Sequence, residues 1–335
     1  MDWKNLGFGY MPANANVRCT CKNGSWSKPE LSSSEYITLH MASTCLHYGQ
    51  EAFEGLKAYR GKDGKIRLFR VRENARRMVR TAEYMQMAAP PEELFVEMVK
   101  MAVRANSDFV PPYESGATLY IRPLLIGVSA QIGVKPAAEY LFTVFVMPVG
   151  PYFKEGFKPV SVMIDRDHDR AAPRGTGHIK VGGNYAASLI SLEMCHRAGY
   201  STVLYLDAAE KKYIDECGPA NFFAIRGKSY ITPKSHSILP SITNMSLMAL
   251  AADMGLTVEQ RKVPVEELST FDEAGACGTA AVISPIGKIF DAAANHAYEY
   301  SKDGSAGKVC TALYNRLRAI QYGDEEDKFG WVEVV

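Results

Sequence analysis

The sequence has almost no net charge, no cysteine framework and no long apolar run. Its 335 residues include 38 basic and 37 acidic side chains, a formal net charge of +1. This balance argues against nucleic acid or an anionic membrane as the main partner. No apolar stretch is long enough to span a bilayer, and the first residues lack the basic and apolar regions of a signal peptide. We therefore expect a cytoplasmic protein without a membrane segment.

The seven cysteines are an odd number and lack the spacing of a disulfide framework, which indicates reduced thiols. Cys19 and Cys21 would share one face of a strand. No second pair of ligands follows them at metal-site spacing, so we predict no metal. The glycine-rich segments do not form the G-x-G-x-x-G or P-loop patterns, so nucleotide binding gains no support.

The length of the chain favours two domains. Residues 148–159 contain three prolines and two glycines and are the best candidate for a linker. We expect residues 1–147 to form a smaller N-terminal α+β domain with an extended arm. Residues 160–335 should form a larger, β-rich C-terminal domain with helices around it, so the fold class is mixed α+β and α/β.

Local patterns predict several elements that matter below. Lys22-Asn-Gly24 favours a hairpin turn. The charged segment 166–170 should be a solvated loop or part of a lid. Apolar periodicity and stop signals predict helices over 72–87, 185–197 and 243–254, and a strand over 117–126 that Pro123 interrupts.

The stretch from Gly175 to Tyr185 carries the most specific chemistry. Lys180 lies between two apolar neighbours in a strand-like segment, and Asn184 is suited to cap the helix that follows. An amine with apolar neighbours loses hydration, which favours its neutral, nucleophilic form. Such a lysine can form a Schiff base with an aldehyde cofactor such as pyridoxal phosphate. The alternative is a surface lysine beside a glycine-rich turn.

Further motifs surround this lysine at plausible separations: Phe53-Glu-Gly-Leu-Lys57, Tyr120-Ile-Arg-Pro123, Lys180-Val-Gly-Gly-Asn-Tyr185, Glu216-Cys-Gly-Pro-Ala-Asn221, Leu239-Pro-Ser-Ile-Thr243 and Gly278-Thr-Ala280. In this order they resemble the branched-chain amino acid aminotransferases, which are fold-type IV pyridoxal-phosphate enzymes. The resemblance extends from about residue 40 to residue 323.

The resemblance implies pyridoxal 5′-phosphate as cofactor and a two-domain fold-type IV architecture. It implies ping-pong transamination of leucine, isoleucine and valine with 2-oxoglutarate, which gives branched-chain 2-oxo acids and L-glutamate. It also implies a role in branched-chain amino-acid biosynthesis and a homodimer in which a loop of each subunit touches the other subunit's pocket.

By the same resemblance, Lys180 forms the Schiff base with the cofactor and moves the proton at the substrate carbon. Glu216 faces the pyridine nitrogen, and Tyr185 hydrogen-bonds the phenolate oxygen. Asp215, beside Glu216, should point to the opposite side of an extended segment.

The resemblance assigns the phosphate to Arg77, to the backbone N–H groups of Ile242 and Thr243 at a helix N-terminus, and to Thr279. A one-residue slip to Arg76 is the main alternative for the arginine. Two departures from the family pattern are Ser241 and Asn244, so a side-chain contact from position 244 is open.

The resemblance also places residues around the substrate. Arg122 helps to admit the distal carboxylate of the second substrate, and the turn at Thr279 and Ala280 binds the substrate carboxylate through backbone N–H groups. Aromatic and apolar residues suit a branched aliphatic side chain; the family walls its pocket with residues that correspond to Tyr48, Phe53, Tyr120 and Val134.

Other functions stay open from the sequence. A related fold-type IV enzyme, a D-amino acid aminotransferase or an aminodeoxychorismate lyase, would share most of these motifs. A non-catalytic, cofactor-carrying protein is a third reading, which the joint presence of Lys180, Glu216 and Arg77 disfavours.

Overall fold

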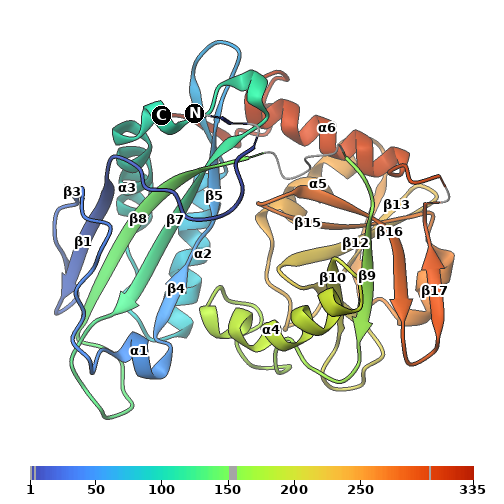
Figure 1. The fold of residues 1–335 in the computed structure, drawn as a ribbon, viewed down its shortest axis with the longest axis horizontal. Coiled ribbons are helices and arrows are strands. Elements are labelled where there is room, and N and C mark those ends of the chain that lie inside the picture. The colour runs from blue at the N-terminus through green and yellow to red at the C-terminus, as the bar shows by residue number, and fades with distance from the viewer. Residues whose placement is uncertain (1, 4, 151–156, 302) are drawn as a thin grey trace. The chain divides into compact units, whose positions relative to one another are not determined.

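The computed structural model describes all residues except 1, 4, 151–156 and 302. Within them the chain divides into two compact units (Figure 1). The first contains the described part of Met1–Pro151, together with Ile179–Gly182 and Ala319–Val335. The second contains the described part of Tyr152–His178 and Gly183–Arg318. Positions 151–156 of the predicted linker lie outside the described residues, and the predicted domain boundaries stay a prediction.

The first unit is built on a nine-stranded sheet in which β18-β6-β5-β7-β8-β1-β2 form the main path, β3 pairs with β1, and β4 pairs with β7. The strands are β1 (Asn16–Lys22), β2 (Ser25–Trp26), β3 (Glu30–Ser32), β4 (Glu51–Phe53), β5 (Leu56–Arg60), β6 (Ile66–Phe69), β7 (Thr118–Gly127), β8 (Glu139–Val149) and β18 (Val332–Val334). Its α-helices are α1 (Thr44–Tyr48), α2 (Val71–Tyr84) and α3 (Glu92–Ala105), with 3₁₀ turns at Ser107–Phe109 and Tyr113–Ser115.

Helices α2 and α3 cover one face of this sheet (Figure 1). The apolar spacing that predicted the first of them is confirmed, because Ala75, Met78 and Ala82 are all at most 1% exposed and belong to one core cluster. The hairpin at Asn23 and Gly24 is also confirmed, with both residues at positive φ. Helix α2 therefore packs its apolar face into the core of this unit.

The prediction that Pro123 interrupts its strand is wrong. Strand β7 runs unbroken through Pro123, which lies opposite Val144 of β8. On its other side β7 pairs first with β5 and then with β4, and the change of partner falls at residues 122–123. The missing proline N–H therefore costs no ladder bond there. At this break Glu54 and Gly55 connect β4 to β5, and Glu54 N donates to the Pro123 carbonyl (2.8 Å).

The second unit contains a closed barrel, because β11-β10-β9-β16-β15-β12 pair in sequence and β12 pairs back with β11. Strands β13 and β14 continue from β12, and β17 pairs with β16. The strands are β9 (Val160–Asp165), β10 (Thr202–Leu206), β11 (Ile214–Cys217), β12 (Ala220–Arg226), β13 (Ser229–Pro233), β14 (Thr257–Arg261), β15 (Glu273–Gly278), β16 (Val282–Asp291) and β17 (His296–Glu299). The helices are α4 (Gly182–Arg197), α5 (Ile242–Asp253), α6 (Lys308–Tyr322) and a 3₁₀ segment, Val265–Thr270. The first residue of α4 and the residues of α6 from Ala319 onward are assigned to the first unit.

Helix α4 begins at Gly182 rather than at residue 185, and Asn184 is inside its first turn. The predicted capping role of Asn184 is therefore wrong. Its amide instead donates to the carbonyl of Thr176 (2.7 Å) and accepts from the Thr176 hydroxyl (2.6 Å). Asn184 thus ties the preceding loop to the helix.

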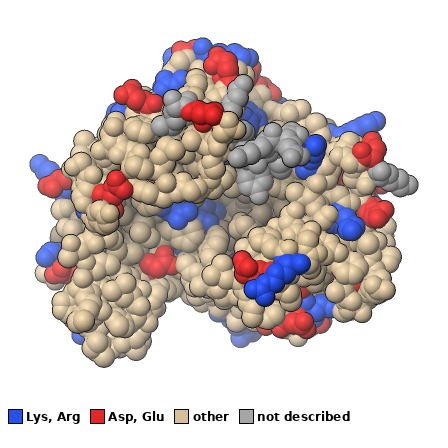
Figure 2. All heavy atoms as spheres, viewed as in Figure 1, with Lys and Arg blue, Asp and Glu red and all other residues tan. Residues whose placement is uncertain are grey.

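Charged side chains of both signs are scattered over the face shown in Figure 2, and neither sign forms a continuous patch there. This agrees with the nearly balanced composition. Among the described helices, none has the length and apolar character needed to cross a membrane.

Candidate functional site

Lys180 lies in an irregular segment of the first unit, not in the strand that the sequence suggested. Its backbone is fixed at two points, since its N–H donates to the Thr81 hydroxyl (3.2 Å) and its carbonyl accepts from Phe53 N (3.2 Å). The flanking Ile179 and Val181 are each 3% exposed. Residues from α2 and β4 thereby hold the lysine in place while its side chain stays partly accessible.

The Phe53 ring lies next to two cationic groups. The Lys180 Nζ atom is 4.8 Å from the ring centroid, and the Arg122 guanidinium carbon is also 4.8 Å from it. Tyr120 is two residues before Arg122 on β7, and its hydroxyl accepts a hydrogen bond from Arg122 Nη2 (3.0 Å). A Cβ at Gly55 would collide with that hydroxyl. The structure thus brings the predicted Lys180, Phe53, Tyr120 and Arg122 into one cluster.

Arg77 and Glu54 form a buried ion pair below this cluster. Arg77 is 5% exposed and Glu54 is 0% exposed. Two parallel bonds join them, Nε to Oε1 (2.7 Å) and Nη2 to Oε2 (2.8 Å), and Asn74 adds a third to Oε2 (2.7 Å). Burial alone would raise the pKa of Glu54, but the Arg77 charge and hydrogen bonds, with Lys180 and Asn74, hold it below its usual range. Arg76, by contrast, is exposed and pairs with Glu73 and Glu92, which favours Arg77 for any buried anion.

We expect Glu54→Gln to destabilise the cofactor-free protein by about 3–5 kcal/mol, because it leaves the buried Arg77 cation without its counter-charge. Urea unfolding measures this as a lower midpoint. Inorganic phosphate should restore part of the loss if Arg77 accepts a phosphate.

The matched control is Asp63→Asn, which removes the exposed carboxylate paired with Arg67. An exposed pair contributes at most about 1 kcal/mol, so this control should hardly move the midpoint. An equally small effect of Glu54→Gln would contradict the buried-pair account.

Glu216 occupies a comparable buried position in the second unit. It is 2% exposed on β11. Its Oε1 atom pairs with Arg170 Nη2 (2.5 Å) and accepts from Leu239 N (3.0 Å), while Oε2 accepts from Asn221 Nδ2 (3.0 Å). Asn221 is the cross-strand partner of Glu216 in the hairpin that closes the barrel. Arg170 is itself held by the carbonyls of Gly177 (2.7 Å) and Ser237 (2.6 Å).

The three bonds leave Glu216 with acceptor capacity, because a carboxylate offers about four lone-pair sites. Among the described residues, Oε2 accepts one hydrogen bond, from Asn221, and has room for another donor. Burial raises the pKa of Glu216 to about 7, although Arg170, Leu239 N and Asn221 oppose the shift. A cationic N–H at Oε2 would favour the ionised carboxylate.

The N-terminus of α5 is formed as the sequence predicted. Ile242 and Thr243 are the first two helical residues, so their N–H groups have no partner within the helix. The side chain of Ser241 caps the helix by accepting from Asn244 N (3.2 Å). The Asn244 side chain is 4% exposed and bonds to Tyr230, Thr232 and Asn221. Asn244 thereby supports the residue that holds Glu216.

Thr279 and Ala280 lie in the tight turn between β15 and β16. Val282, which ends this turn, has φ 67°, a costly conformation for a β-branched residue. Such strain gathers at ligand-binding turns. Tyr185, on α4, lines a separate cavity of about 160 Å³ with Gly218 and Pro219.

Tyr48 and Val134 form a second group in the first unit. Tyr48 ends α1 and is 39% exposed, and its hydroxyl donates to the carbonyl of Ile132. Val134 is two residues further along that loop and 84% exposed. Both side chains are therefore exposed in this unit.

Several residues that support the site have no role that the sequence indicates. Arg170 was expected in a solvated or lid loop, but it is only 9% exposed and pairs with Glu216. Asn221 and Glu54 belong to two of the motifs given above, but the motifs do not indicate a role for either residue. Thr81 lies one turn after Arg77 on α2. Apart from this helical spacing, nothing in the sequence indicates its hydrogen bond with the Lys180 backbone.

Comparison with known proteins gives consistent findings. The family described as amino-transferase class IV matches residues 51–289. A branched-chain-amino-acid aminotransferase of Haemophilus influenzae is 48% identical over 99% of this chain and 98% of its own length. One of Helicobacter pylori is also 48% identical, over 99% and 97%.

Solved structures agree with these relatives. The Escherichia coli branched-chain amino acid aminotransferase superposes with a TM-score of 0.81 at 26% identity, covering 96% of this chain and 99% of that one. The branched-chain amino acid aminotransferase from Thermobaculum terrenum, in its PLP-bound holo-form, gives a TM-score of 0.80 at 25% identity, with 97% and 99% covered.

Proposed function

Since the chain belongs to the class IV aminotransferase family, we propose that it transfers the amino group of leucine, isoleucine or valine to 2-oxoglutarate. The products are the branched-chain 2-oxo acids and L-glutamate. The observation that carries this proposal is the 48% identity over 99% of the chain to curated branched-chain aminotransferases. The resemblance stated from the motifs, and the fold class with it, is confirmed.

The residues present fit pyridoxal 5′-phosphate as the cofactor. Glu216 keeps an acceptor site for a ring N–H, and the first turn of α5 offers N–H groups for a phosphate. Arg77 adds a buried positive charge whose position Glu54 fixes. When bound, this cofactor supplies an electron sink that makes the Cα proton of an amino acid removable.

Lys180 is the residue that we assign to covalent attachment and to proton transfer. Its amine is the nucleophile toward an aldehyde, and once displaced it can take the proton from the substrate Cα and deliver it to the cofactor carbon C4′. Two hydrogen bonds hold the Lys180 backbone, one to the Thr81 hydroxyl and one from Phe53 N. They fix the position from which the side-chain amine reaches the substrate. The substrate leaves as an oxo acid, and the second substrate completes the ping-pong cycle.

Phe53 and Tyr120 supply an apolar wall for a branched side chain, and a charged side chain there would lose hydration without a partner. We assign the exposed Tyr48 and Val134 to the wall of a neighbouring subunit's pocket in a homodimer. The unpaired state of all seven cysteines, each within the described residues, supports a cytoplasmic location.

Arg122 is the residue that we assign to the distal carboxylate of 2-oxoglutarate. It forms no ion pair with the described residues, although its guanidinium lies over Phe53. We expect Arg122→Met to raise KM for 2-oxoglutarate about 10–100-fold, the value of a lost charge-assisted hydrogen bond. The half-reaction with leucine should change less than about threefold.

Stopped-flow half-reactions with leucine and with 2-oxoglutarate separate these effects. A monocarboxylic acceptor, 4-methyl-2-oxopentanoate, should be unaffected by Arg122→Met. Arg104→Met, an exposed arginine on α3, is the matched control. Equal losses with both acceptors would remove Arg122 from carboxylate recognition.

The visible absorption spectrum of the purified protein tests the overall function. The band of lysine-bound cofactor should bleach with L-leucine and return with 2-oxoglutarate. A band that ignores leucine but responds to D-alanine or to a chorismate-derived amine would favour a D-amino acid aminotransferase or an aminodeoxychorismate lyase. Absence of any band after added cofactor would favour the non-catalytic alternative.

A further inference from the structure

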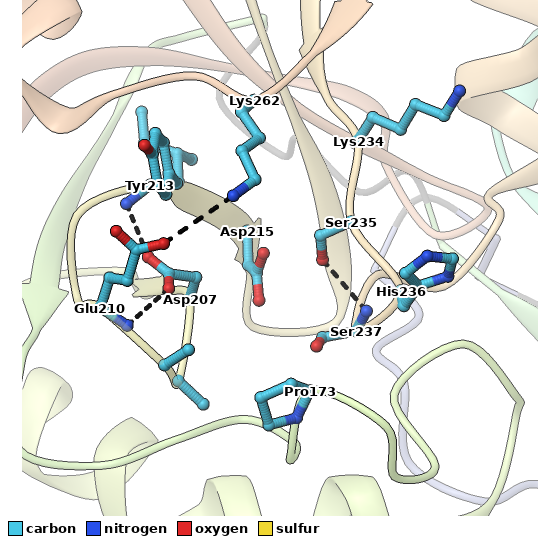
Figure 3. A pocket seen from close by; sticks show the side chains of 13 residues that line it. Pro173, Asp207, Glu210, Tyr213, Asp215, Lys234, Ser235, His236, Ser237 and Lys262 are labelled. Carbon is cyan, nitrogen blue, oxygen red and sulfur yellow. Dashed lines mark hydrogen bonds and ion pairs between the residues drawn. The ribbon is translucent and has the colours of Figure 1, made fainter.

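The second unit contains a cavity of about 480 Å³ that the proposed reaction does not use (Figure 3). Its apolar lining includes Pro173, Ala208 and Ile214. Its polar lining carries three carboxylates, Asp207, Glu210 and Asp215, and two lysines, Lys234 and Lys262, of which Lys262 pairs with Glu210. This volume is within the range of sites that hold small organic molecules.

Asp215 lines this cavity and has a buried carboxylate oxygen without a hydrogen-bond donor among the described residues. It is 4% exposed, and Figure 3 shows its carboxylate pointing into the cavity, toward Pro173. Its Oδ1 atom is buried and has no hydrogen-bond partner among the residues that the structure describes. A buried acceptor without a donor is costly and rare in native proteins. The position therefore calls for a donor from outside the chain.

The neighbouring carboxylates already have partners. Asp207 accepts from the backbone N–H groups of Glu210 (2.8 Å), Lys212 (2.9 Å) and Tyr213 (2.7 Å). The Glu210 carboxylate lies 3.8 Å from Lys262 Nζ. Asp215 is thus the acid of this cavity with a buried oxygen, Oδ1, that no described residue reaches, although a hydrogen bond from Ser235 acts on its carboxylate.

The charge around Asp215 favours a cationic donor. Burial raises the pKa of Asp215, and the charges of Asp207 and Asp169 add to this, while Ser235 and Arg170 oppose it. A positive ligand would stabilise the ionised carboxylate. A metal ion fits poorly, because the described residues contain no group of three or more His, Cys, Asp or Glu placed to hold one.

We propose that this cavity binds a small organic ammonium ligand with at least one N–H and an apolar body. The N–H donates to Oδ1 of Asp215, and the apolar body contacts Pro173, Ala208 and Ile214. This site is separate from the proposed cofactor contact, since consecutive residues of β11 point to opposite faces and Glu216 is the next residue.

The cavity is nevertheless linked to Glu216. The carbonyl of Ser237, a lining residue, accepts from Arg170 Nη2 (2.6 Å), and the same nitrogen pairs with Glu216. A ligand here would therefore rest against the residues that hold the Glu216 carboxylate.

Isothermal titration of the holoenzyme with N,N-dimethylbutylamine tests this proposal. A protonated tertiary amine carries one N–H and cannot form a Schiff base with an aldehyde cofactor. We expect it to bind about 10–100-fold more tightly than N,N,N-trimethylbutylammonium, which has the charge without the donor, and than butanol, which has a donor without the charge. Equal binding of the tertiary and quaternary ions would overturn the proposal.

Two variants locate the binding. Asp215→Asn should weaken the tertiary amine at least about tenfold, and Ala208→Leu should block it by filling the cavity while the carboxylate stays. Asp303→Asn, which removes an exposed carboxylate elsewhere in this unit, should bind as the unchanged protein does. Retained binding in both cavity variants would place the amine at another site and refute the assignment.

Discussion

Lys180→Ala is expected to lower the rate of transamination by at least about 10⁴-fold while the protein stays folded. The substitution removes the amine that we propose as both the nucleophile toward the cofactor and the base for the substrate Cα proton. Its structural cost should be small, because the backbone bonds to Thr81 and Phe53 do not involve the side chain. The lost contact between Nζ and the Phe53 ring is worth about 1 kcal/mol. Leucine half-reactions and thermal unfolding of the same sample measure the two effects.

Two further variants sharpen this result. Lys180→Arg keeps a cation beside Phe53 but removes the primary amine, so it should be as inactive as the alanine variant. Lys65→Ala, an exposed lysine of the same unit, should retain full activity. Turnover of Lys180→Ala near that of Lys65→Ala would show that another group carries the cofactor.

The sequence singles out Lys180 as a candidate through its neighbours and the surrounding motifs, but it does not indicate the shape of the backbone there. Apolar neighbours and glycines favoured a strand that ends at a helix capped by Asn184. In the structure, the amide of Asn184 binds Thr176, and helix α4 starts at Gly182, whose N–H donates to the Glu51 carboxylate. Glu51 is far from Gly182 in the sequence, so the pattern of neighbouring residues cannot predict this contact.

The supporting charges were missed for a similar reason. A segment with alternating charges, such as 166–170, is usually solvated, and only the burial of Glu216 creates the need that Arg170 fills. Glu54 likewise lies between β4 and β5, which pair with successive parts of β7. Its buried position depends on the register of the whole sheet, which a local sequence pattern does not contain. By contrast, α2 followed from its own periodicity, because it presents one continuous apolar face.

Glu216→Gln is expected to lower the rate about 10²–10³-fold with the cofactor still bound. The amide keeps the shape of the side chain but removes the negative charge that would favour a protonated pyridine nitrogen. Arg170 would then face a neutral group, while its bonds to the carbonyls of Gly177 and Ser237 keep it in place. We expect the cofactor to be retained because the substitution leaves unchanged the other groups that we propose to bind it, namely Lys180, Arg77 and the N-terminus of α5.

Absorption spectra at matched protein concentration measure cofactor content, and single-turnover reactions with leucine measure the chemical step. Glu216→Asp keeps the charge but shortens the side chain. Its rate should lie between the rate of the unchanged protein and that of Glu216→Gln. Glu299→Gln removes an exposed carboxylate of the same unit and should leave the rate unchanged. An unchanged rate in Glu216→Gln would remove this residue from the ring nitrogen. If Glu216→Gln instead loses the absorption band of the bound cofactor, Glu216 is needed to hold the cofactor. The buried pair with Arg170 would then contribute more than the charge at Oε2.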